Sequence, residues 1–231
     1  MSIEVICHRP SHQGNIGAVA RAMKVCELSQ LHLIEPKESP NDEAYDRATN
    51  HAHHILRDCS VHQDLHTCVS EFDQVYAFTN RPRDLTLPFI TVEQAALQIA
   101  QYPAARIGLL FGPERTGLTN NDCLLAHHCV TIPTPGLAAM NLSHAVQTAL
   151  YVIRHQPTSI SLKKRWPSAA HKQAFFDDLD QRLHACQFYH PDRIHQTKAK
   201  LVSMFQRMDP SHDELQMLHG LITTLNTEDV P

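Results

Sequence analysis

Amide, carboxylate and guanidinium side chains gather beside glycines in three separated stretches of the chain. Each stretch comes where an apolar run gives way to a helical pattern. Loops at the carboxyl ends of parallel strands line the ligand crevice of an open α/β sheet. Neither the dinucleotide-binding nor the P-loop glycine pattern occurs, so we expect a crevice without those phosphate cradles. The stretches are Asn15-Ile-Gly17-Ala-Val-Ala-Arg21, Leu110-Phe-Gly-Pro-Glu-Arg-Thr-Gly-Leu-Thr-Asn120 and Ile132-Pro-Thr-Pro-Gly-Leu-Ala-Ala-Met-Asn-Leu-Ser-His-Ala-Val-Gln147.

Histidine is unusually frequent, with 18 residues, and invites a search for metal ligands. His51, His53 and His54 cluster in a predicted helix, with Cys59, His62 and His66 downstream. Side chains at positions i, i+2 and i+3 of one helix cannot all point at a single ion. We therefore predict surface histidines and no metal site.

The composition excludes nucleic-acid binding by bulk charge. The 231 residues carry 20 Lys and Arg against 24 Asp and Glu, a net charge of −4, so any RNA contact must be local. The tightest basic run, Lys163 to Arg165, precedes the single tryptophan, Trp166, which either stacks on a base or packs at a linker. An ordinary solvated linker is the alternative explanation for the run.

Seven cysteines without a CxxC pair indicate reduced thiols rather than a disulfide framework or a zinc ribbon. No apolar run approaches the length of a membrane span, and no targeting segment is evident. These features predict a cytoplasmic protein without a membrane partner.

Strand and helix patterns alternate through residue 155, which predicts an α/β fold with a mostly parallel sheet. Thr119 to Asp122 has the spacing of a capping box that opens a further helix. The predicted strands are Ile3–Cys7, Leu31–Ile34, Val75–Thr79, Ile107–Phe111 and Cys129–Ile132, and the predicted helices are Ala18–Cys26, Asp42–Leu56, Val92–Gln101 and Asn141–His155.

A second, all-helical unit follows a proline-bounded stretch. Pro157 to Pro167 has no periodicity, whereas apolar residues beyond it recur every three or four positions in three short helices. We predict a first domain over residues 1–156, a linker over 157–167 and a small α-helical domain over 168–231.

Together, the three stretches resemble the motifs of the 2′-O-ribose RNA methyltransferases of the SPOUT superfamily. Further segments look like the TrmJ type of tRNA methyltransferase, so the resemblance covers nearly the whole chain. They are His12 to Gly17, Ala20 to Lys24, Leu28 to Leu33, Phe188 to Pro191 and Leu218 to Gly220. The resemblance implies a deep trefoil knot at the end of the sheet domain, S-adenosylmethionine as cofactor, a homodimer, and a tRNA pyrimidine at anticodon-loop position 32 as substrate.

The same resemblance implies roles for individual residues. Arg21 would orient the ribose hydroxyl or a nearby phosphate and stabilise the developing alkoxide. Asn15 would fix that arginine, Glu114 would hold the motif loops together or take the proton, and Asn141 would complete the catalytic set. The implied cofactor contacts are Phe78, Thr79, Asn80, Gly112, Ile132, Ala138, Ala139 and Met140, and the implied RNA contacts are Arg9, Arg81, Arg83, Arg115, Lys163, Lys164 and Arg165.

One departure from the family pattern bears on activity. Ala139 stands where the family usually has a serine, so that hydroxyl is missing from the third motif. The alternative function is therefore a catalytically weak RNA-binding protein that keeps the cofactor fold. A third possibility is an enzyme that uses another adenine nucleotide in the same crevice.

Overall fold

A seven-stranded, all-parallel sheet forms the centre of the first domain in a computed structural model, which describes residues 2–81, 89–136, 140–155 and 166–224. Its strand order is β3-β2-β1-β6-β4-β7-β5, and every neighbouring pair is parallel. The predicted parallel α/β fold is confirmed, whereas the knot stays a prediction. The strands are β1 (Ser2–His8), β2 (Leu31–Ile34), β3 (Ser60–His62), β4 (Gln74–Phe78), β5 (Phe89–Thr91), β6 (Arg106–Phe111) and β7 (His128–Thr131).

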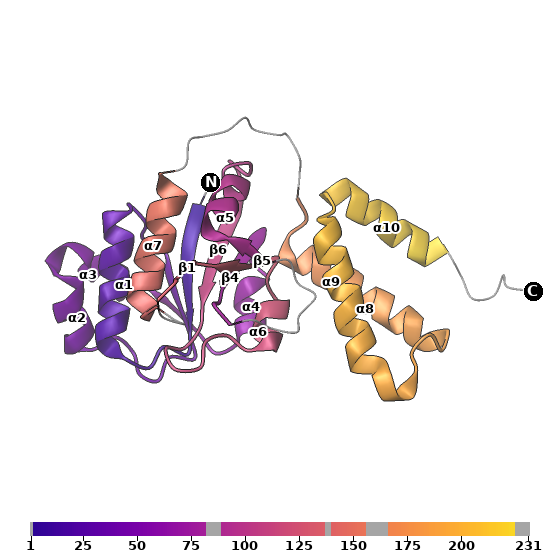
Figure 1. Cartoon of the computed structure of the whole chain (residues 1–231), viewed down its shortest axis with the longest axis horizontal. Helices are drawn as coiled ribbons and strands as arrows, with labels where there is room; N and C mark the ends of the chain where they lie inside the picture. The colour runs from indigo at the N-terminus through magenta and orange to yellow at the C-terminus, as the bar shows by residue number, and fades with distance from the viewer. Residues whose placement is uncertain (1, 82–88, 137–139, 156–165, 225–231) are drawn as a thin grey trace, which may run out of the picture.

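Helices cover both faces of this sheet and enclose two apolar cores. Helices α1 (Gln13–Val25), α5 (Val92–Ile99) and α7 (Leu142–Arg154) pack on one face, with α2 (Asp42–Ala48) and α3 (His53–Arg57) outside α1 (Figure 1). The opposite face packs on α4 (Leu65–Val69) and α6 (Asn120–Leu124). Strands buried on both faces explain the unbroken apolar runs of β4 and β6.

Three helices that position the site begin at side chains that cap their first turn. Thr91 and Thr119 each form a capping box, and the latter confirms the box expected at the start of α6. The carboxamide oxygen of Asn141 accepts a hydrogen bond from the Ser143 backbone and starts α7. Each cap satisfies amides that the first helical turn leaves unpaired.

The sequence patterns did not predict the short elements β3, α4 and β5, and they misplaced some boundaries. Helix α1 begins at Gln13, so Gly14 and Gly17 lie inside it and not in a loop. A Cβ on Gly17 would lie 2.0 Å from the Ala44 carbonyl oxygen, so this glycine permits α1 to pack on α2. The predicted helix Asp42–Leu56 breaks at Thr49, whose φ is 62°. The short elements α4 and β5 show no clear periodicity.

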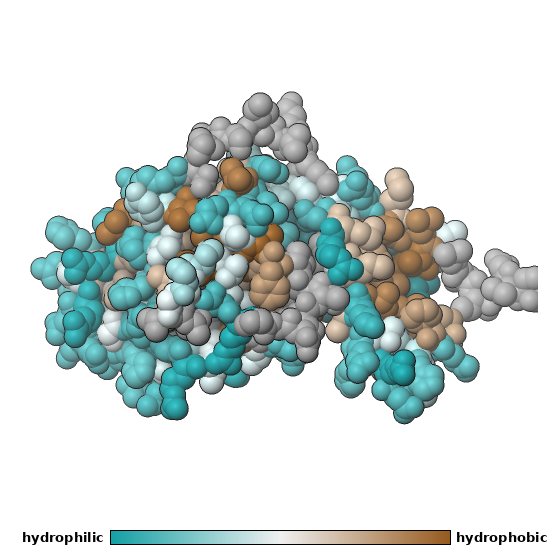
Figure 2. Space-filling view, in the orientation of Figure 1, coloured by the Kyte–Doolittle hydropathy of each residue, from teal (hydrophilic) through white to brown (hydrophobic). Residues whose placement is uncertain are grey.

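Three helices form the C-terminal unit, as predicted: α8 (Ala169–Ala185), α9 (Ile194–Met208) and α10 (His212–Thr224). Phe175 is buried between them, with the Phe205 ring 5.0 Å away and the His219 ring 6.0 Å away. Figure 2 shows hydrophobic residues gathered over this unit. Its exposed members are Phe188, Met204, Met208, Met217 and Leu221.

The C-terminal unit is attached where the described chain resumes. The Trp166 ring packs edge-on against Tyr102 at 4.8 Å, which favours packing over base stacking for this tryptophan. The Ala169 amide donates a hydrogen bond of 3.0 Å to the Phe72 carbonyl. None of the helices in the described ranges has the length and apolar character needed to cross a membrane.

Candidate active site

A pocket of about 320 Å³ opens where β4, β6 and β7 end at their carboxyl edge. Its volume lies in the usual range for small-molecule sites, and its walls combine apolar side chains with a few polar groups. The lining residues are Phe78, Thr79, Asn80, Arg81, Phe111, Gly112, Pro113, Glu114, Arg115, Gly117, Val130, Ile132, Met140, Leu142 and Ala145.

Side-chain contacts between neighbouring strands shape this pocket. The Phe78 and Phe111 rings stack at 4.5 Å with an angle of 13° between their planes. Asn80 accepts a hydrogen bond of 2.6 Å from the Thr131 hydroxyl and donates one of 2.8 Å to the Thr134 hydroxyl, which ties the loop after β4 to the loop after β7.

A hydrogen-bond network joins the three motif stretches beside the pocket. The Asn15 amide donates to a Glu114 oxygen at 3.0 Å, and the Asn141 amide donates to the Asn15 oxygen at 2.9 Å. Ser11 adds backbone and hydroxyl donors to Glu114, at 3.1 and 2.9 Å, and the His12 amide donates at 3.3 Å. Residues about 100 positions apart in the sequence are thereby held in one cluster.

The Glu114 carboxyl is held in its ionised form. Partial burial alone would raise its pKa, but the hydrogen bonds from Asn15, Ser11 and the local backbone outweigh burial, and the net pKa is lowered. Both carboxylate oxygens are occupied by donors. Of the two predicted roles, this geometry favours holding the loops together over accepting a proton.

Arg21 is exposed on α1 and is not among the residues that line the pocket. It lies six positions after Asn15, which places it about 120° around the helix and about 9 Å along the axis. Asn15 instead bonds Glu114 and Asn141, and no hydrogen bond to Arg21 is found. Asn15 thus makes no direct contact of this kind with Arg21 of the same chain, and its role toward Arg21 stays a prediction.

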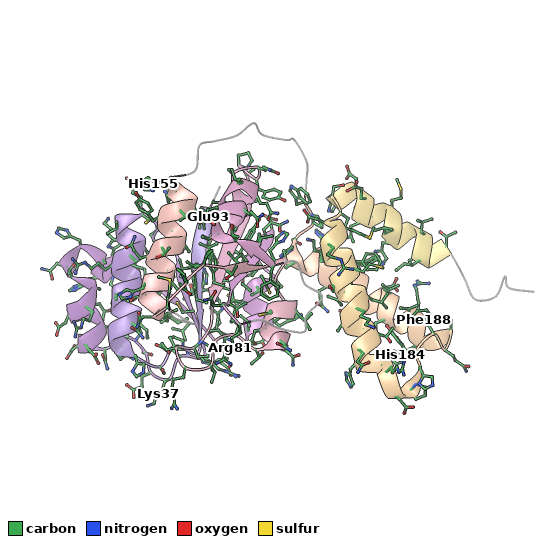
Figure 3. All side chains as sticks on the ribbon, in the orientation of Figure 1. Lys37, Arg81, Glu93, His155, His184 and Phe188 are labelled. Atoms are coloured by element: carbon green, nitrogen blue, oxygen red, sulfur yellow. The ribbon has the colours of Figure 1, made fainter. Side chains whose placement is uncertain are left out.

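Basic side chains lie at the same edge of the sheet. Arg81 and Lys37 both lie there, and the Arg81 guanidinium donates to the Arg115 carbonyl at 3.3 Å (Figure 3). Arg9 forms an ion pair with Glu35, with its Nε and Nη2 atoms 2.8 and 2.7 Å from the carboxylate, so its charge is already partnered within the chain. Lys37 was not among the predicted RNA contacts. Its position shortly after β2, at the carboxyl edge of the sheet, is the sequence feature that could have indicated it.

The pocket contains all the predicted cofactor residues that lie in the described ranges: Phe78, Thr79, Asn80, Gly112, Ile132 and Met140. The sequence did not single out Phe111, Val130 or Leu142 as pocket residues, although Phe111 ends β6, Val130 is the next-to-last residue of β7 and Leu142 begins α7. Ala138, Ala139, Arg83, Lys163, Lys164 and Arg165 lie outside the described residues.

The fold and pocket define a methylase of the SpoU class. The chain belongs to the SpoU rRNA Methylase family, whose sequence profile matches residues 2–151. A second profile, that of the C-terminal domain of the tRNA methyltransferase TrmJ, matches residues 171–229. The family expected from the three motifs is therefore confirmed.

The similarity to TrmJ proteins extends over the full length. The chain is 31% identical to the tRNA (cytidine/uridine-2′-O-)-methyltransferase TrmJ of Sodalis glossinidius, over 100% of this chain and 93% of that protein. The same enzyme of Klebsiella pneumoniae is 29% identical over 98% of this chain and 97% of its own length. The crystal structure of TrmJ from Z. mobilis ZM4 matches with a TM-score of 0.84 at 30% identity, covering 97% of this chain and 99% of that one.

Proposed function

We propose that this chain is an S-adenosylmethionine-dependent methyltransferase that acts on the ribose 2′-hydroxyl of tRNA. The observation that carries the proposal is the pocket at the carboxyl edge of β4, β6 and β7, beside the network of Glu114, Asn15 and Asn141. The full-length similarity to TrmJ enzymes supports tRNA as the substrate. It also supports the cytoplasm as the location of the protein.

The pocket residues fit the proposed cofactor. The stacked Phe78 and Phe111 rings, with Ile132 and Leu142, give an apolar wall for an adenine base, and the loop backbone at Gly112 faces the same space. The Glu114 carboxylate lies at this pocket and suits a positively charged sulfur. When bound, S-adenosylmethionine supplies the methyl group already activated for transfer.

The chain's own task is then to align the hydroxyl and to stabilise the charge that develops on its oxygen. Arg21 carries the side chain suited to this role, because its guanidinium stays charged and offers several donors. Because a guanidinium is a poor base, we propose that Arg21 orients the ribose 2′-hydroxyl and stabilises the charge on its oxygen. The hydroxyl proton is then lost in the same step in which the methyl group is transferred.

A homodimer is proposed because Arg21 does not line the pocket of its own chain. The arginine is exposed and lies outside the pocket of its own chain, so a partner subunit would bring it to the partner's pocket. Helices α1 and α7 pack against each other. Each carries a large exposed apolar side chain, Val25 on α1 at 68% and Tyr151 on α7 at 57%, and such side chains suit burial between two copies of the chain.

Arg21→Lys and Arg21→Ala test the catalytic assignment. We expect transfer of labelled methyl from S-adenosylmethionine into tRNA to fall about 100-fold or more in both variants, because a lysine lacks the planar fork. Calorimetric affinity for S-adenosylhomocysteine should stay unchanged. Lys24→Ala, one turn along the same helix, is the matched control. Full activity of Arg21→Lys at neutral pH would refute the role.

Co-expression of Arg21→Ala with Gly112→Ala subunits tests the dimer. If Arg21 acts in the partner's pocket, each mixed dimer keeps one complete site, and the mixture should recover about a quarter of wild-type activity. If both residues serve the same chain's site, the mixture stays inactive.

The modified position is read from the product. We expect the 2′-O-methyl group at position 32 of the anticodon loop, by digestion and mass spectrometry of the methylated tRNA. A chain of similar fold, at 23% identity, is described as acting on C/U34, which makes position 34 the informative alternative. Intact tRNA binding without any methyl transfer would favour the catalytically weak RNA-binding protein.

A further inference from the structure

A second cluster of reactive side chains lies on the sheet, separated from the pocket by β1. His32 on β2, His62 on β3 and Cys68 on α4 place one donor atom each within 4.8 Å of one another, the one such group of three among the residues that the structure describes. Of the histidines that drew attention in the sequence, only His62 belongs to this group, and His32 and Cys68 were not considered there. They come from three elements, so only the folded chain brings them together.

The cluster lies on the face of the sheet that α4 covers. His32 and Cys68 are buried, and His62 is half buried on the edge strand. The His32 Nδ1 and His62 Nε2 atoms are 3.0 Å apart, and the two ring centroids are separated by 5.3 Å. His62 on an edge strand leaves one side of the cluster next to solvent.

Glu4 fixes which nitrogen of His32 is free to bind. The Glu4 carboxylate lies 2.7 Å from His32 Nε2 and is held in turn by Arg106 at 2.8 and 3.0 Å. A carboxylate in that place keeps the proton on Nε2 and directs the Nδ1 lone pair toward His62 and Cys68. This is the arrangement of an outer carboxylate that orients a metal-binding histidine.

We propose that His32 Nδ1, His62 Nε2 and Cys68 Sγ bind a Zn²⁺ ion, with a water from the open side as the fourth ligand. Two imidazoles and one thiolate are donors that zinc prefers. On binding, Cys68 gives up its thiol proton to solvent, and the proton by which His62 Nε2 bonds His32 Nδ1 in the metal-free chain is exchanged through solvent to His62 Nδ1. Donor atoms around tetrahedral zinc lie about 3.4–3.6 Å apart. The two ring nitrogens, now 3.0 Å apart, must therefore separate by about 0.4 Å, and the Cys68 sulfur, within 4.8 Å of them, must approach by up to about 1 Å.

Bound zinc would cross-link three elements, two of which are short. Strand β3 has three residues and pairs on one side with β2, and α4 has five. A zinc ion that binds only the folded chain stabilises it by mass action. The proposal therefore concerns the stability of this edge of the sheet and does not depend on methyl transfer.

Cobalt titration of the metal-free full-length chain tests the site. We expect one Co²⁺ per chain, with the intense visible bands of tetrahedral coordination and a thiolate-to-cobalt charge-transfer band, both displaced by one equivalent of Zn²⁺. Zn²⁺ should also raise the melting temperature. Glu4→Gln should weaken Co²⁺ binding about 10- to 100-fold, because the neutral amide no longer holds the His32 proton on Nε2.

Cys68→Ser and His62→Gln should each abolish the charge-transfer band, whereas His66→Gln, an exposed histidine on the same helix, should keep it. Circular dichroism of the metal-free variants verifies that each one folds. If Cys68→Ser does not fold, His62→Gln is the variant that tests the site. Absence of the band in the wild-type chain, or a band that survives in a folded Cys68→Ser or His62→Gln variant, would overturn the proposal.

Discussion

The hydrogen-bond partners of Glu114 determine which of its two predicted roles the structure favours. Its type alone is compatible with proton transfer or with structural support, and the network around it favours support. Donors from Ser11, His12 and Asn15 fill both of its oxygens. Burial raises its pKa, but the hydrogen bonds from Asn15, Ser11 and the local backbone outweigh burial and lower it. A carboxylate stabilised in this way is a weak proton acceptor.

Glu114→Gln separates these two roles. If Glu114 supports the loops, the neutral amide leaves donors poorly paired at a cost of about 1–3 kcal/mol, and affinity for S-adenosylhomocysteine should fall about 10- to 100-fold. Calorimetry measures this loss. If affinity stays at the wild-type level while the methyl-transfer rate collapses, Glu114 is the proton acceptor instead.

At the scale of elements, the loop from β6 to α6 depends on a close backbone approach. A Cβ on Gly112 would lie 2.4 Å from the Leu118 amide nitrogen and 2.6 Å from the Gly117 carbonyl carbon. Gly117 has a φ of 63°, in the left-handed region that glycine adopts without strain. These two glycines fold the loop back on itself and give the pocket one of its walls.

Gly112→Ala should therefore displace backbone, since no flexible side chain can move aside. We expect a loss of at least 10-fold in S-adenosylhomocysteine affinity, measured by calorimetry, together with lower stability. Gly136→Ala is the matched control, because a Cβ there meets nothing within 4 Å. Equal affinities for the two variants would show that the loop tolerates the extra methyl group.

The capping box at the start of α6 predicts a smaller effect. Thr119 accepts from the Asp122 amide at 3.1 Å and donates its own amide to the Asp122 carboxylate at 2.7 Å. Thr119→Ala should lower the free energy of unfolding by about 1 kcal/mol in urea denaturation. Thr116→Ala, an exposed position in the preceding loop, is the control, and a loss of similar size there would contradict the assignment.

At the scale of the whole molecule, the sheet domain and the C-terminal helices meet around buried basic groups. His128 begins β7 and the buried His127 precedes it. The Lys172 side chain on α8 is 12% exposed, with its ammonium 3.9 Å from Asp209. Burial, with Lys172 nearby, lowers the pKa of His128 to about 4 and that of His127 well below its usual value. Both imidazoles are therefore neutral in the folded chain near neutrality.

This burial predicts loss of stability in mild acid. The unfolded chain takes up a proton at His128 near pH 6.5, and the folded chain does so only near pH 4, so unfolding becomes easier as pH falls through that window. The shift corresponds to about 2 kcal/mol between pH 7 and pH 5, measured by urea denaturation. His128→Phe, which keeps a ring beside Tyr76, should reduce this pH dependence, whereas the exposed His144→Asn should not.

The sequence by itself determined the class of fold, the family and most of the pocket. Apolar runs mark β4 and β6 because both faces are buried, and the residues after them face one edge in any parallel sheet. It did not determine the partners of side chains far apart in the chain. The tertiary structure decided that Asn15 bonds Glu114 and Asn141, that Arg21 is exposed outside the lining of the pocket, and that His32, His62 and Cys68 meet. The physical reason is that periodicity records which face of an element is buried, whereas a contact depends on how separate elements pack.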